Sequence, residues 1–349
     1  MTKRTGILDI GLVGCGRIAE LAHLRALARL AGVRVTALAE PDETRRLAAS
    51  RHAPGAALFA DFRELLSGSA VDAVVVTLPP ALHATAAIAA FDAGKHVYLE
   101  KPIATTLDEA RAVIAAWTRS GRIGMVGFNY RFHPLYQLAR EHLRASRLGE
   151  LVAVRTVFSS AARVLPAWKQ DRQSGGGALM ELASHHVDLV HFLFEQPVVE
   201  VSALVRSQQS DADSVSLHLR LAGDLLVQSF CSINAVADDR FDIYGRKGRL
   251  SIDRYAGTLA IGRPEHRDGR LTRAQRELRW LAGAARRVIR PAGEPSHGAA
   301  LDAFVRAIRE SRPAAPDLHD GYRSLAIVDA AERSSTGQAV SLSAAQLAP

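Results

Sequence analysis

ILDIGLVGCGRIA, the stretch from Ile7 to Ala19, joins a short apolar run to a glycine turn, and a helical pattern follows it to about Leu30. An apolar run of this length is typical of a buried strand. In a G-x-G-x-x-A turn between a strand and a helix, the first glycine permits the tight turn and the second lets a pyrophosphate approach the backbone. The helix N-terminus then faces the phosphates. The stretch therefore predicts a strand–turn–helix unit that binds a dinucleotide.

The next predicted strand, from Val33 to Glu40, ends in an acidic residue. A carboxylate at this place accepts hydrogen bonds from the ribose hydroxyls of NAD, and its charge repels the 2′-phosphate of NADP. Arg45 and Arg46 follow closely, so NADP is not excluded. A glycine motif alone is weak evidence, and a tight turn without a ligand remains the alternative. We expect the near half of an NAD site to comprise Gly14, Cys15, Gly16, Arg17, Ile18 and Glu40.

Strands and helices alternate through the first part of the chain. Further strands are expected near 57–59, 71–80, 96–99 and 122–130, and helices near 42–52, 61–66, 82–93 and 108–120. This order is typical of βαβ units and predicts an α/β fold with a doubly wound parallel sheet. We expect residues 1–127 to form this dinucleotide-binding domain.

TLPPALH, from Thr77 to His83, follows the fourth predicted strand. Its prolines prevent continued strand pairing. The turn is expected at the carboxyl edge of the sheet, where the nicotinamide half of a dinucleotide would rest. Thr77, Pro79 and His83 are therefore candidate cofactor-binding residues, and so are Glu100 and Lys101 after the next strand. A solvent-facing position at a helix start is the alternative for His83.

GKHVYLEKPIAT, from Gly94 to Thr105, places Glu100, Lys101 and Pro102 directly after a short apolar strand. Lysine, unlike arginine, can release its proton when its pKa is lowered, and the chain uses it sparingly. Pro102 biases Lys101 to extended geometry, and Glu100 is placed to orient or tune its amine. A strand end that reaches solvent is the plain interpretation. A catalytic lysine beside the crevice of the sheet is the functional one.

Beyond about Phe128, strands follow one another without intervening helices, which predicts a large, mostly antiparallel open sheet. Residues 128–349 are expected to form a second, α+β domain for substrate binding and oligomerisation. One broad face of its sheet is expected to serve as a dimer surface. The expected strands cover 151–160, 198–207, 214–223 and 225–234, with a hairpin over 241–253 and helices near 297–311 and 320–337.

SGGGALMELASHHVDLVHFLF, from Ser174 to Phe194, places three glycines ahead of a helical run. Glu181, His185 and Asp188 recur at i, i+4 and i+7, so they share one predicted helix face. The glycine run would let the chain pass close to a ligand, which favours a functional His185. A solvated helix face is the alternative. The remaining histidines of the run are expected on the helix surface or in satisfied packing: His186 and His191.

Composition narrows the classes of function. The 349 residues suffice for two domains, no apolar run reaches membrane-spanning length, and no signal peptide is recognisable. The two cysteines, Cys15 and Cys231, do not make a disulfide framework, so a cytoplasmic location is expected. No Cys/His spacing predicts a metal site. The net charge of +8 is not accompanied by a nucleic-acid-binding motif, so no nucleic-acid partner is expected.

The segment 263–295 is expected to be a basic insertion. Nine arginines lie between Arg263 and Arg290, with leucines and Trp280 at roughly helical spacing. A solvated insertion that covers an edge of the fold is the interpretation we favour. A basic amphipathic helix on a membrane surface or an acidic partner is the alternative. A modest positive field would also draw in a dinucleotide or an anionic substrate, such as a nucleotide sugar or a sugar acid.

These motifs in this order resemble the glucose–fructose oxidoreductase / inositol dehydrogenase / MocA-like family, over nearly the whole chain. The resemblance rests on Gly14-Cys15-Gly16 with Ala19, Glu40-Pro41-Asp42, Pro79-Pro80 with His83, Glu100-Lys101-Pro102, Asn129-Tyr130-Arg131 with Pro134, and Gly175-Gly176-Gly177 leading to His185 and Asp188. It implies an N-terminal Rossmann domain, a C-terminal domain with an open sheet, and a homodimer or homotetramer.

The resemblance also implies an enzyme, an NAD(P)-dependent dehydrogenase or reductase acting on a secondary alcohol or ketone carbon of a sugar, cyclitol or nucleotide sugar. Lys101 matches the usual proton-transfer residue and His185 its usual partner. The family acid four residues before that histidine is usually Asp, and Glu181 stands there with a longer reach. The substrate-side candidates are Lys101, Tyr130, Arg131, Trp168, Lys169, Glu181 and His185. Trp168 would stack on a sugar face, with ordinary core or interface packing as the alternative.

Two other functions remain open at this stage. An enzyme of the same fold can use tightly held NAD for a redox-neutral reaction, such as glycoside cleavage through a transient ketone. A non-catalytic NAD-dependent sensor is the second alternative, and the presence of both Lys101 and His185 argues against it.

Overall fold

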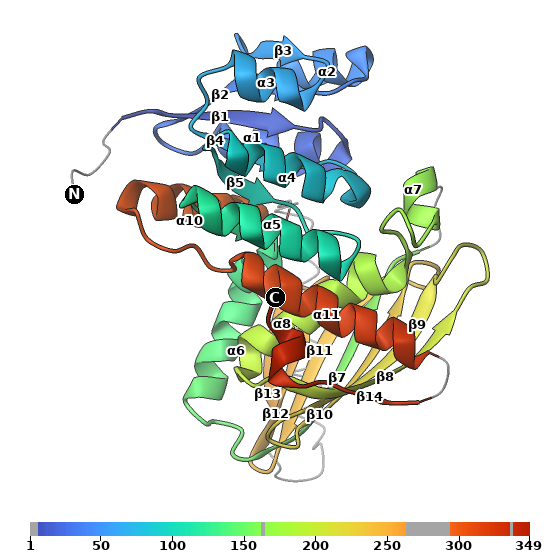
Figure 1. Ribbon diagram of the computed structural model, residues 1–349. Coiled ribbons are helices and arrows are strands. Elements are labelled where there is room, and N and C mark those ends of the chain that lie inside the picture. The colour runs from blue at the N-terminus through green and yellow to red at the C-terminus, as the bar shows by residue number, and fades with distance from the viewer. Residues whose placement is uncertain (1–5, 162–164, 263–293, 336–337) are drawn as a thin grey trace.

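The computed structural model describes residues 6–161, 165–262, 294–335 and 338–349 and contains two sheets with helices packed on them (Figure 1). The first sheet is built from the N-terminal strands and the second from strands that follow residue 150. This arrangement confirms the predicted α/β class with a doubly wound parallel sheet and a second, mostly antiparallel sheet. The basic segment predicted at 263–295 lies outside the described residues except for its last two.

All pairs of neighbouring strands in the first sheet are parallel, and their order is β3-β2-β1-β4-β5-β6. The strands are β1 (Leu8–Val13), β2 (Val33–Ala39), β3 (Ala57–Phe59), β4 (Ala73–Val76), β5 (His96–Leu99) and β6 (Gly124–Val126). The chain order reverses between β1 and β4, and ligands of such sheets bind at the carboxyl ends of the strands at this switch point. The glycine turn, the TLPP turn and Lys101 all follow strands at this edge.

The helices of the first domain lie close to their predicted positions. They are η1 (Ala19–His23), α1 (Leu24–Leu27), α2 (Glu43–Ser50), α3 (Phe62–Gly68), η2 (Pro80–Leu82), α4 (His83–Asp92) and α5 (Leu107–Ser120). The α5 start is fixed by a capping box, in which Thr106 accepts from the Glu109 N–H and the Glu109 side chain accepts from the Thr106 N–H. The one departure is η1, a π-helical turn where an ordinary helix was predicted.

The second sheet has the order β13-β12-β11-β7-β10-β9-β8-β14, and only β7 and β10 pair in parallel within it. Its strands are β7 (Leu151–Ser159), β8 (Val198–Arg206), β9 (Ser214–Leu221), β10 (Leu226–Ser232), β11 (Asp238–Gly245), β12 (Gly248–Asp253), β13 (Thr258–Gly262) and β14 (Val340–Ser341). Its associated helices are η3 (Asn129–Phe132), α6 (Pro134–Arg144), α7 (Ala167–Gln170), η4 (Leu179–Ala183), α8 (Ser184–Phe194), α11 (Leu318–Ser334) and η5 (Ala344–Leu347).

One face of the second sheet is covered and the other is open. Alternate residues of β10 are buried toward α8 and α11, as the period of two requires. On the opposite face Leu204, Leu226 and Phe230 are exposed, Leu204 to 68%. The register places Leu204 and Phe230 each opposite Ser216 on β9, so the two lie in one row across the sheet.

The helix α10 (Ser296–Glu310) packs on the first sheet, although it comes late in the chain. Its Leu301, Phe304 and Val305 are buried in a cluster with residues of β1, α1 and β5. The predicted boundary at residue 128 assigns this helix to the second domain. The chain therefore returns to its first domain to complete that domain's core.

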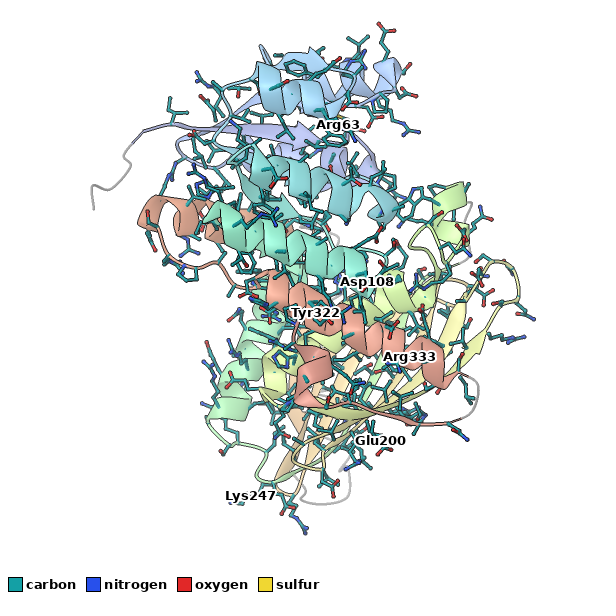
Figure 2. All side chains as sticks on the ribbon, viewed as in Figure 1. Arg63, Asp108, Glu200, Lys247, Tyr322 and Arg333 are labelled. Carbon is teal, nitrogen blue, oxygen red and sulfur yellow. The ribbon has the colours of Figure 1, made fainter. Side chains whose placement is uncertain are left out.

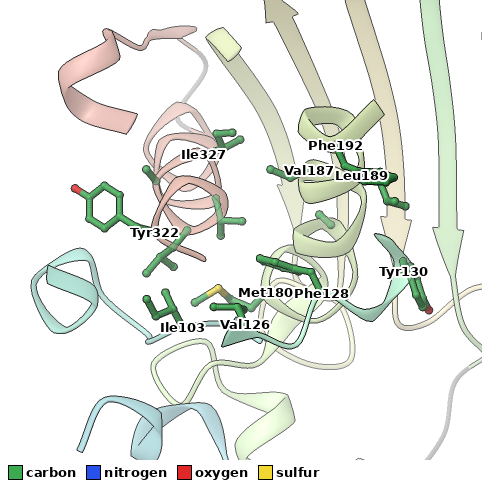
Figure 3. Packing of buried hydrophobic residues seen from close by; sticks show 14 of the residues in the cluster. Ile103, Val126, Phe128, Tyr130, Met180, Val187, Leu189, Phe192, Tyr322 and Ile327 are labelled. Atoms are coloured by element: carbon green, nitrogen blue, oxygen red, sulfur yellow. The ribbon is translucent and has the colours of Figure 1, made fainter. Parts of the chain in front are cut away.

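A single apolar cluster runs from the first sheet into the second (Figure 3). Ile103 and Val126 of the first domain lie beside Met180 of η4, with Tyr322 of α11 next to them. Figure 2 labels Arg63 on α3 in the first domain and, toward the opposite end of the molecule, Lys247 at the tip of the β11–β12 hairpin. Because the shared core is continuous, the loops that follow the first sheet are held against η4.

Candidate active site

The glycine turn has the shape that a dinucleotide needs. Gly14 has φ +90°, and a Cβ there would lie 2.9 Å from the backbone of Thr77, so only glycine fits. The Thr77 hydroxyl donates to the Gly14 carbonyl at 2.6 Å and ties the turn to the end of β4. A Cβ at Gly16 would meet nothing within 4 Å. The turn therefore offers open space beside a helix start, which fits a pyrophosphate.

Glu40 lies where its carboxylate borders that turn. It is buried, with Oε2 accepting from the Cys15 N–H at 2.8 Å and Oε1 from the Asp42 N–H at 3.2 Å. Arg46 donates to the carbonyls of Glu40 and Pro41, so its guanidinium is engaged with backbone. A carboxylate at this edge, with the neighbouring arginine bonded to backbone carbonyls, fits the ribose of NAD and disfavours a 2′-phosphate.

The other predicted residues of the glycine turn differ in exposure. Arg17 and Ile18 are exposed at the first turn, whereas Cys15 is buried. Burial raises the pKa of the Cys15 thiol to about 12, with the Glu40 charge adding to the effect. Its contribution is therefore that of its backbone N–H and its volume.

His83 joins two loops instead of facing solvent. It is 1% exposed, with Nδ1 2.6 Å from the Pro102 carbonyl and Nε2 2.8 Å from the Leu78 carbonyl. The solvent-facing alternative is excluded. Pro79 lies half-buried in the loop that His83 holds, and direct contact of either residue with a cofactor remains a prediction.

Lys101 leaves the end of β5 and points to the second domain. Its Nζ donates to the Glu181 carbonyl at 2.8 Å and lies 3.4 Å from the Met180 carbonyl. Burial lowers the pKa of the Lys101 amine, the charges of Glu181 and Glu100 oppose this, and Lys169 adds to it. The interpretation of a strand end that simply reaches solvent is therefore not supported. The strand end carries an amine whose neutral form is favoured by burial.

The two carbonyls that accept from Lys101 belong to a π-helical turn, η4. In this turn the Ser184 N–H bonds back five residues to the Leu179 carbonyl instead of four. Such turns shift the hydrogen-bond pattern of a helix and are frequent at functional sites. The predicted helix begins in this widened turn, which presents its carbonyls to Lys101.

The glycines ahead of η4 pass close to the protein's own chain. A Cβ at Gly175 would lie 2.5 Å from Pro80, and one at Gly176 would lie 2.4 Å from the Lys169 carbonyl. The sequence suggested that these glycines allow close approach of a ligand. The structure shows that they allow close approach of the TLPP loop and of the segment that carries Trp168 and Lys169.

His185 stacks on Tyr130, with ring centroids 4.4 Å apart. Burial, followed by the nearby charges of Lys101 and Arg254, holds the pKa of His185 well below its ordinary value. Its Nδ1 is buried and has no hydrogen-bond partner among the described residues. His185 is therefore held as a neutral imidazole, and its lowered pKa makes it a weak proton acceptor at neutral pH.

A pocket of about 170 Å³ lies beside Tyr130, the residue on which His185 stacks, and several predicted residues line it. Tyr130, Lys169 and Glu181 border it, and the Lys169 ammonium pairs with the Glu181 carboxylate. Trp168 stands next to it, with the Lys169 amine 4.8 Å from its ring centroid. Lys101 does not line the pocket itself and reaches its wall through the hydrogen bond to the Glu181 carbonyl.

Two further pocket residues, Arg254 and Tyr255, were not predicted from the sequence. The Arg254 guanidinium lies 4.3 Å from the Tyr130 ring centroid and pairs with Asp239 at 2.7 Å and Glu294 at 2.6 Å. Both residues follow β12 in a polar turn. The sequence of that turn is typical of an ordinary hairpin end. No signal in the sequence therefore distinguished Arg254 and Tyr255 from solvent-facing residues.

Arg131 and Asp188 are not part of this pocket. They form a buried ion pair at 2.6 Å, which Asp320 extends from α11. Burial raises the pKa of Asp188 to about 6, against the opposing charge of Arg131. The predicted common face of Glu181, His185 and Asp188 is therefore not formed at the pocket.

The two histidines expected to be structural take different positions. His186 is 1% exposed, and its Nε2 lies 3.3 Å from Asp239. His191 is partly buried near the last turn of α8, and burial lowers its pKa to about 4. His186 is thus the core residue of the pair, bonded through Nε2, whereas its buried Nδ1 has no hydrogen-bond partner among the described residues.

His23, Glu100 and His297 are the one group of described residues whose ligand atoms lie close enough for a metal ion, within 4.8 Å of one another. Nδ1 of both histidines is buried without a hydrogen-bond partner. Histidine ligands normally donate their second ring N–H to an acceptor. His23 and Glu100 also bond directly to each other at 2.7 Å. We therefore interpret the group as a hydrogen-bonded cluster.

The strand order, the glycine turn at the switch point and the open second sheet define a two-domain oxidoreductase with a Rossmann nucleotide-binding domain. The chain matches a family described as "Oxidoreductase family, NAD-binding Rossmann fold" over residues 8–128 and the "GFO/IDH/MocA C-terminal domain" over residues 136–251. It therefore belongs to the Gfo/Idh/MocA oxidoreductases, as the motif order indicated. The predicted NAD cofactor and the predicted enzyme class are confirmed.

Individual proteins in the comparisons agree with this assignment. "Inositol 2-dehydrogenase 2" of Saccharopolyspora erythraea is 29% identical over 339 residues, covering 93% of this chain and 91% of that protein. "Levoglucosan dehydrogenase, complex with NADH" has a TM-score of 0.84 at 23% identity and covers 96% of this chain and 99% of that one. The WlbA dehydrogenase from Bordetella pertussis, solved with NADH and UDP-GlcNAcA, has a TM-score of 0.83 at 22% identity over 97% and 99%. These two structures show the shared fold.

Proposed function

We propose that the protein oxidises a secondary alcohol of an uncharged sugar or cyclitol with NAD, or reduces the corresponding ketone. The observation that carries this proposal is the amine of the half-buried Lys101, held at the switch-point edge against the wall of the pocket that contains Glu181. The bound nicotinamide would supply the hydride acceptor. The residues of this chain bind the substrate and move its proton.

Lys101 and His185 are the two candidates for moving the hydroxyl proton. Burial favours the neutral form of both, and the positive charge that either gains stabilises the alkoxide that develops as hydride leaves. Because burial moves the pKa of Lys101 toward the working pH and that of His185 away from it, Lys101 is the more effective base of the two. Tyr130 orients the His185 ring by stacking, and the Glu181 backbone holds the Lys101 amine.

The charge of the pocket supports a neutral substrate. Lys169 is paired with Glu181, and Arg254 is paired with Asp239 and Glu294, so the cations at the pocket are already compensated. An anionic sugar acid or nucleotide sugar would need a free cation there, which none of the described lining residues provides. The aromatic rings of Tyr130 and Tyr255 offer apolar surface for a sugar or cyclitol ring.

The direct test is a substrate panel with purified protein, followed by the absorbance of reduced nicotinamide. The panel contains inositols, free sugars, sugar acids and nucleotide sugars, each with NAD and with NADP. We expect turnover with an uncharged polyol and NAD, and Lys101→Met should lower kcat by at least about 100-fold while NADH still binds. Full turnover in Lys101→Met would contradict the role of the lysine. Turnover confined to the charged sugars would contradict the substrate class.

The open face of the second sheet supports a homo-oligomer. Leu204, Leu226 and Phe230 are exposed on this face, and a second copy of the chain would cover the same three residues reciprocally. Among the described residues, no helix is both long and apolar enough to cross a membrane. A cytoplasmic location remains a proposal that rests on the cysteine content.

A further inference from the structure

His23 is fully buried at the end of the π-helical turn η1, and none of the motifs in the sequence marks it. Its Nε2 lies 2.7 Å from Oε1 of Glu100, a residue 77 positions further along the chain. The turn η1 follows the glycine loop directly. One hydrogen bond therefore links the helix of the nucleotide-binding turn to the residue beside Lys101.

The Glu100 side chain lies in a slot with little freedom. Its Oε2 lies 3.2 Å from the Lys101 backbone nitrogen, which donates to it, and Oε1 accepts from His23. A Cβ at Gly127 would lie 3.0 Å from the Glu100 carboxyl carbon, so Gly127 provides just enough room. Because the Lys101 N–H is one of its donors, a displaced carboxylate would also displace the backbone from which the Lys101 side chain leaves.

The same contacts keep Glu100 charged. Burial alone would raise its pKa, but the hydrogen bond and charge of His23, helped by His297 and Lys101, bring the pKa of Glu100 to about 2. The carboxylate is then ionised throughout the neutral range. Its negative charge favours the protonated amine of Lys101 and so limits how far burial lowers that pKa.

We propose that His23 is a positioning residue, which holds Glu100 as a carboxylate beside Lys101 and so fixes where the lysine stands and how it titrates. The inference deepens the proposed function, because it rests on Lys101 as the proton-transfer group. It assigns a role in the chemistry to a residue that touches neither substrate nor cofactor.

A purely structural role for His23 makes a different prediction. Its ring makes edge contacts with Tyr98 and His297, at centroid distances of 5.6 and 5.5 Å. If packing alone mattered, any side chain of similar volume would serve. The hydrogen bond demands a donor at the position of Nε2, which the amide nitrogen of glutamine supplies and leucine does not.

The test is the titration of Lys101 in the full-length protein, followed by NMR of lysine labelled at its ε position. The chain has five lysines, Lys3, Lys95, Lys101, Lys169 and Lys247, so the signals are few, and Lys101→Arg identifies the one of interest. The charged groups that act on the Lys101 amine are Glu181, Lys169 and Glu100, and His185 is coupled to it in turn. Lys247, at its hairpin tip, is the reference (Figure 2).

In His23→Leu the Glu100 carboxyl loses the partner that keeps it ionised, so we expect Lys101 to titrate about one pH unit lower than in the wild type. In His23→Gln the wild-type midpoint should return. His96→Leu removes a histidine at the opposite end of β5, whose Nδ1 accepts from the Ile123 N–H, and should leave the midpoint unchanged. A wild-type midpoint in His23→Leu, with the Lys247 signal unaltered, overturns the proposal.

If His23→Leu does not fold, Glu100→Gln tests the charge through which His23 is proposed to act, because it removes that charge and keeps the shape. Lys101 should again titrate at lower pH, and an unchanged midpoint overturns the proposal. The titration requires no substrate. A wild type without turnover on any polyol would therefore count against the proposed function and leave the role of His23 to be decided by NMR. With a substrate in hand, kcat should fall about tenfold in His23→Leu and recover in His23→Gln.

Discussion

Lys101 shows what a sequence can and cannot say about a single residue. Its place after a strand, before a proline and among few lysines was enough to mark it as a candidate for proton transfer. The direction of its side chain was not predictable, because the accepting carbonyls come from a π-helical turn 80 residues away. A motif names the residue, whereas the elements packed against it decide its protonation.

Arg131 illustrates the opposite case. It stands in a motif of the family, beside Tyr130 that lines the pocket, yet its guanidinium is committed to Asp188 and Asp320. Adjacent residues in an irregular segment point in different directions, and the sequence alone does not show which one reaches the site. The buried pair instead joins η3 to α8 and α11.

Glu40 gives a prediction about cofactor choice. Glu40→Ser removes the charge that repels a 2′-phosphate and the acceptor for ribose hydroxyls. We expect the ratio of NADH to NADPH affinity to fall by at least about tenfold, which is about 1.4 kcal/mol. Titration of each reduced nucleotide by its fluorescence measures the two dissociation constants.

Glu43→Ser is the matched control, since Glu43 is exposed in the first turn of α2. It should leave the ratio as it is in the wild type. An unchanged ratio in Glu40→Ser would show that discrimination against NADPH comes from elsewhere in the turn.

At the scale of elements, hydrophobic periodicity predicted nearly every strand of both sheets. It did not reveal the two π-helical turns, because one extra residue in a turn shifts every later side chain around the helix axis. That shift explains why Asp188 pairs with Arg131 and does not share the pocket that Glu181 lines. The helix α6 was overlooked although Pro134 stands at its first position, which is a common helix start.

The glycine run before η4 gives a prediction for this element. In Gly176→Ala the new Cβ would meet the Lys169 carbonyl, so the backbone must move. We expect the free energy of unfolding to fall by about 1–3 kcal/mol and the KM for the polyol to rise, because Lys169 is displaced from Glu181. Chemical denaturation and steady-state kinetics measure the two effects.

Gly298→Ala is the control for this change. Gly298 lies in α10, and a Cβ there would contact only Ala26, at 3.9 Å. Stability should stay equal or rise slightly, since alanine favours a helix more than glycine does. If Gly176→Ala were as stable and as active as the wild type, the close packing of the run would not be needed for the pocket.

At the scale of the whole molecule, the open sheet face predicts the assembly state. A double variant, Leu204→Glu with Phe230→Glu, places two charges in one row of the exposed face. If a second copy covers this face, burial of four carboxylates per dimer prevents association. Size-exclusion chromatography with light scattering should give an oligomer for the wild type and a monomer for the variant.

Leu47→Glu is the control for the assembly test, since Leu47 is 50% exposed on α2 in the first domain. Its mass should match that of the wild type. An oligomer of unchanged mass in the double variant would assign the contact to another surface.

The packing of α10 was beyond reach of the sequence for a general reason. Its apolar stripe shows that the helix is half-buried, but the pattern does not say which sheet lies beneath it. Only the structure shows that residues after 295 cover β1 and β5. Domain boundaries drawn along a chain fail wherever a late segment returns to an early one.

This return has a consequence for biosynthesis. While the chain leaves the ribosome, the first six parallel strands are all available by residue 126, yet the apolar surface that receives Leu301 and Phe304 stays bare until α10 has been translated. A nascent or truncated N-terminal piece therefore exposes this apolar surface until the second domain has been synthesised. Intermediates with exposed apolar surface are the kind that chaperones bind. The nucleotide-binding domain is therefore synthesised first, but it completes its fold only near the end of translation, when α10 becomes available.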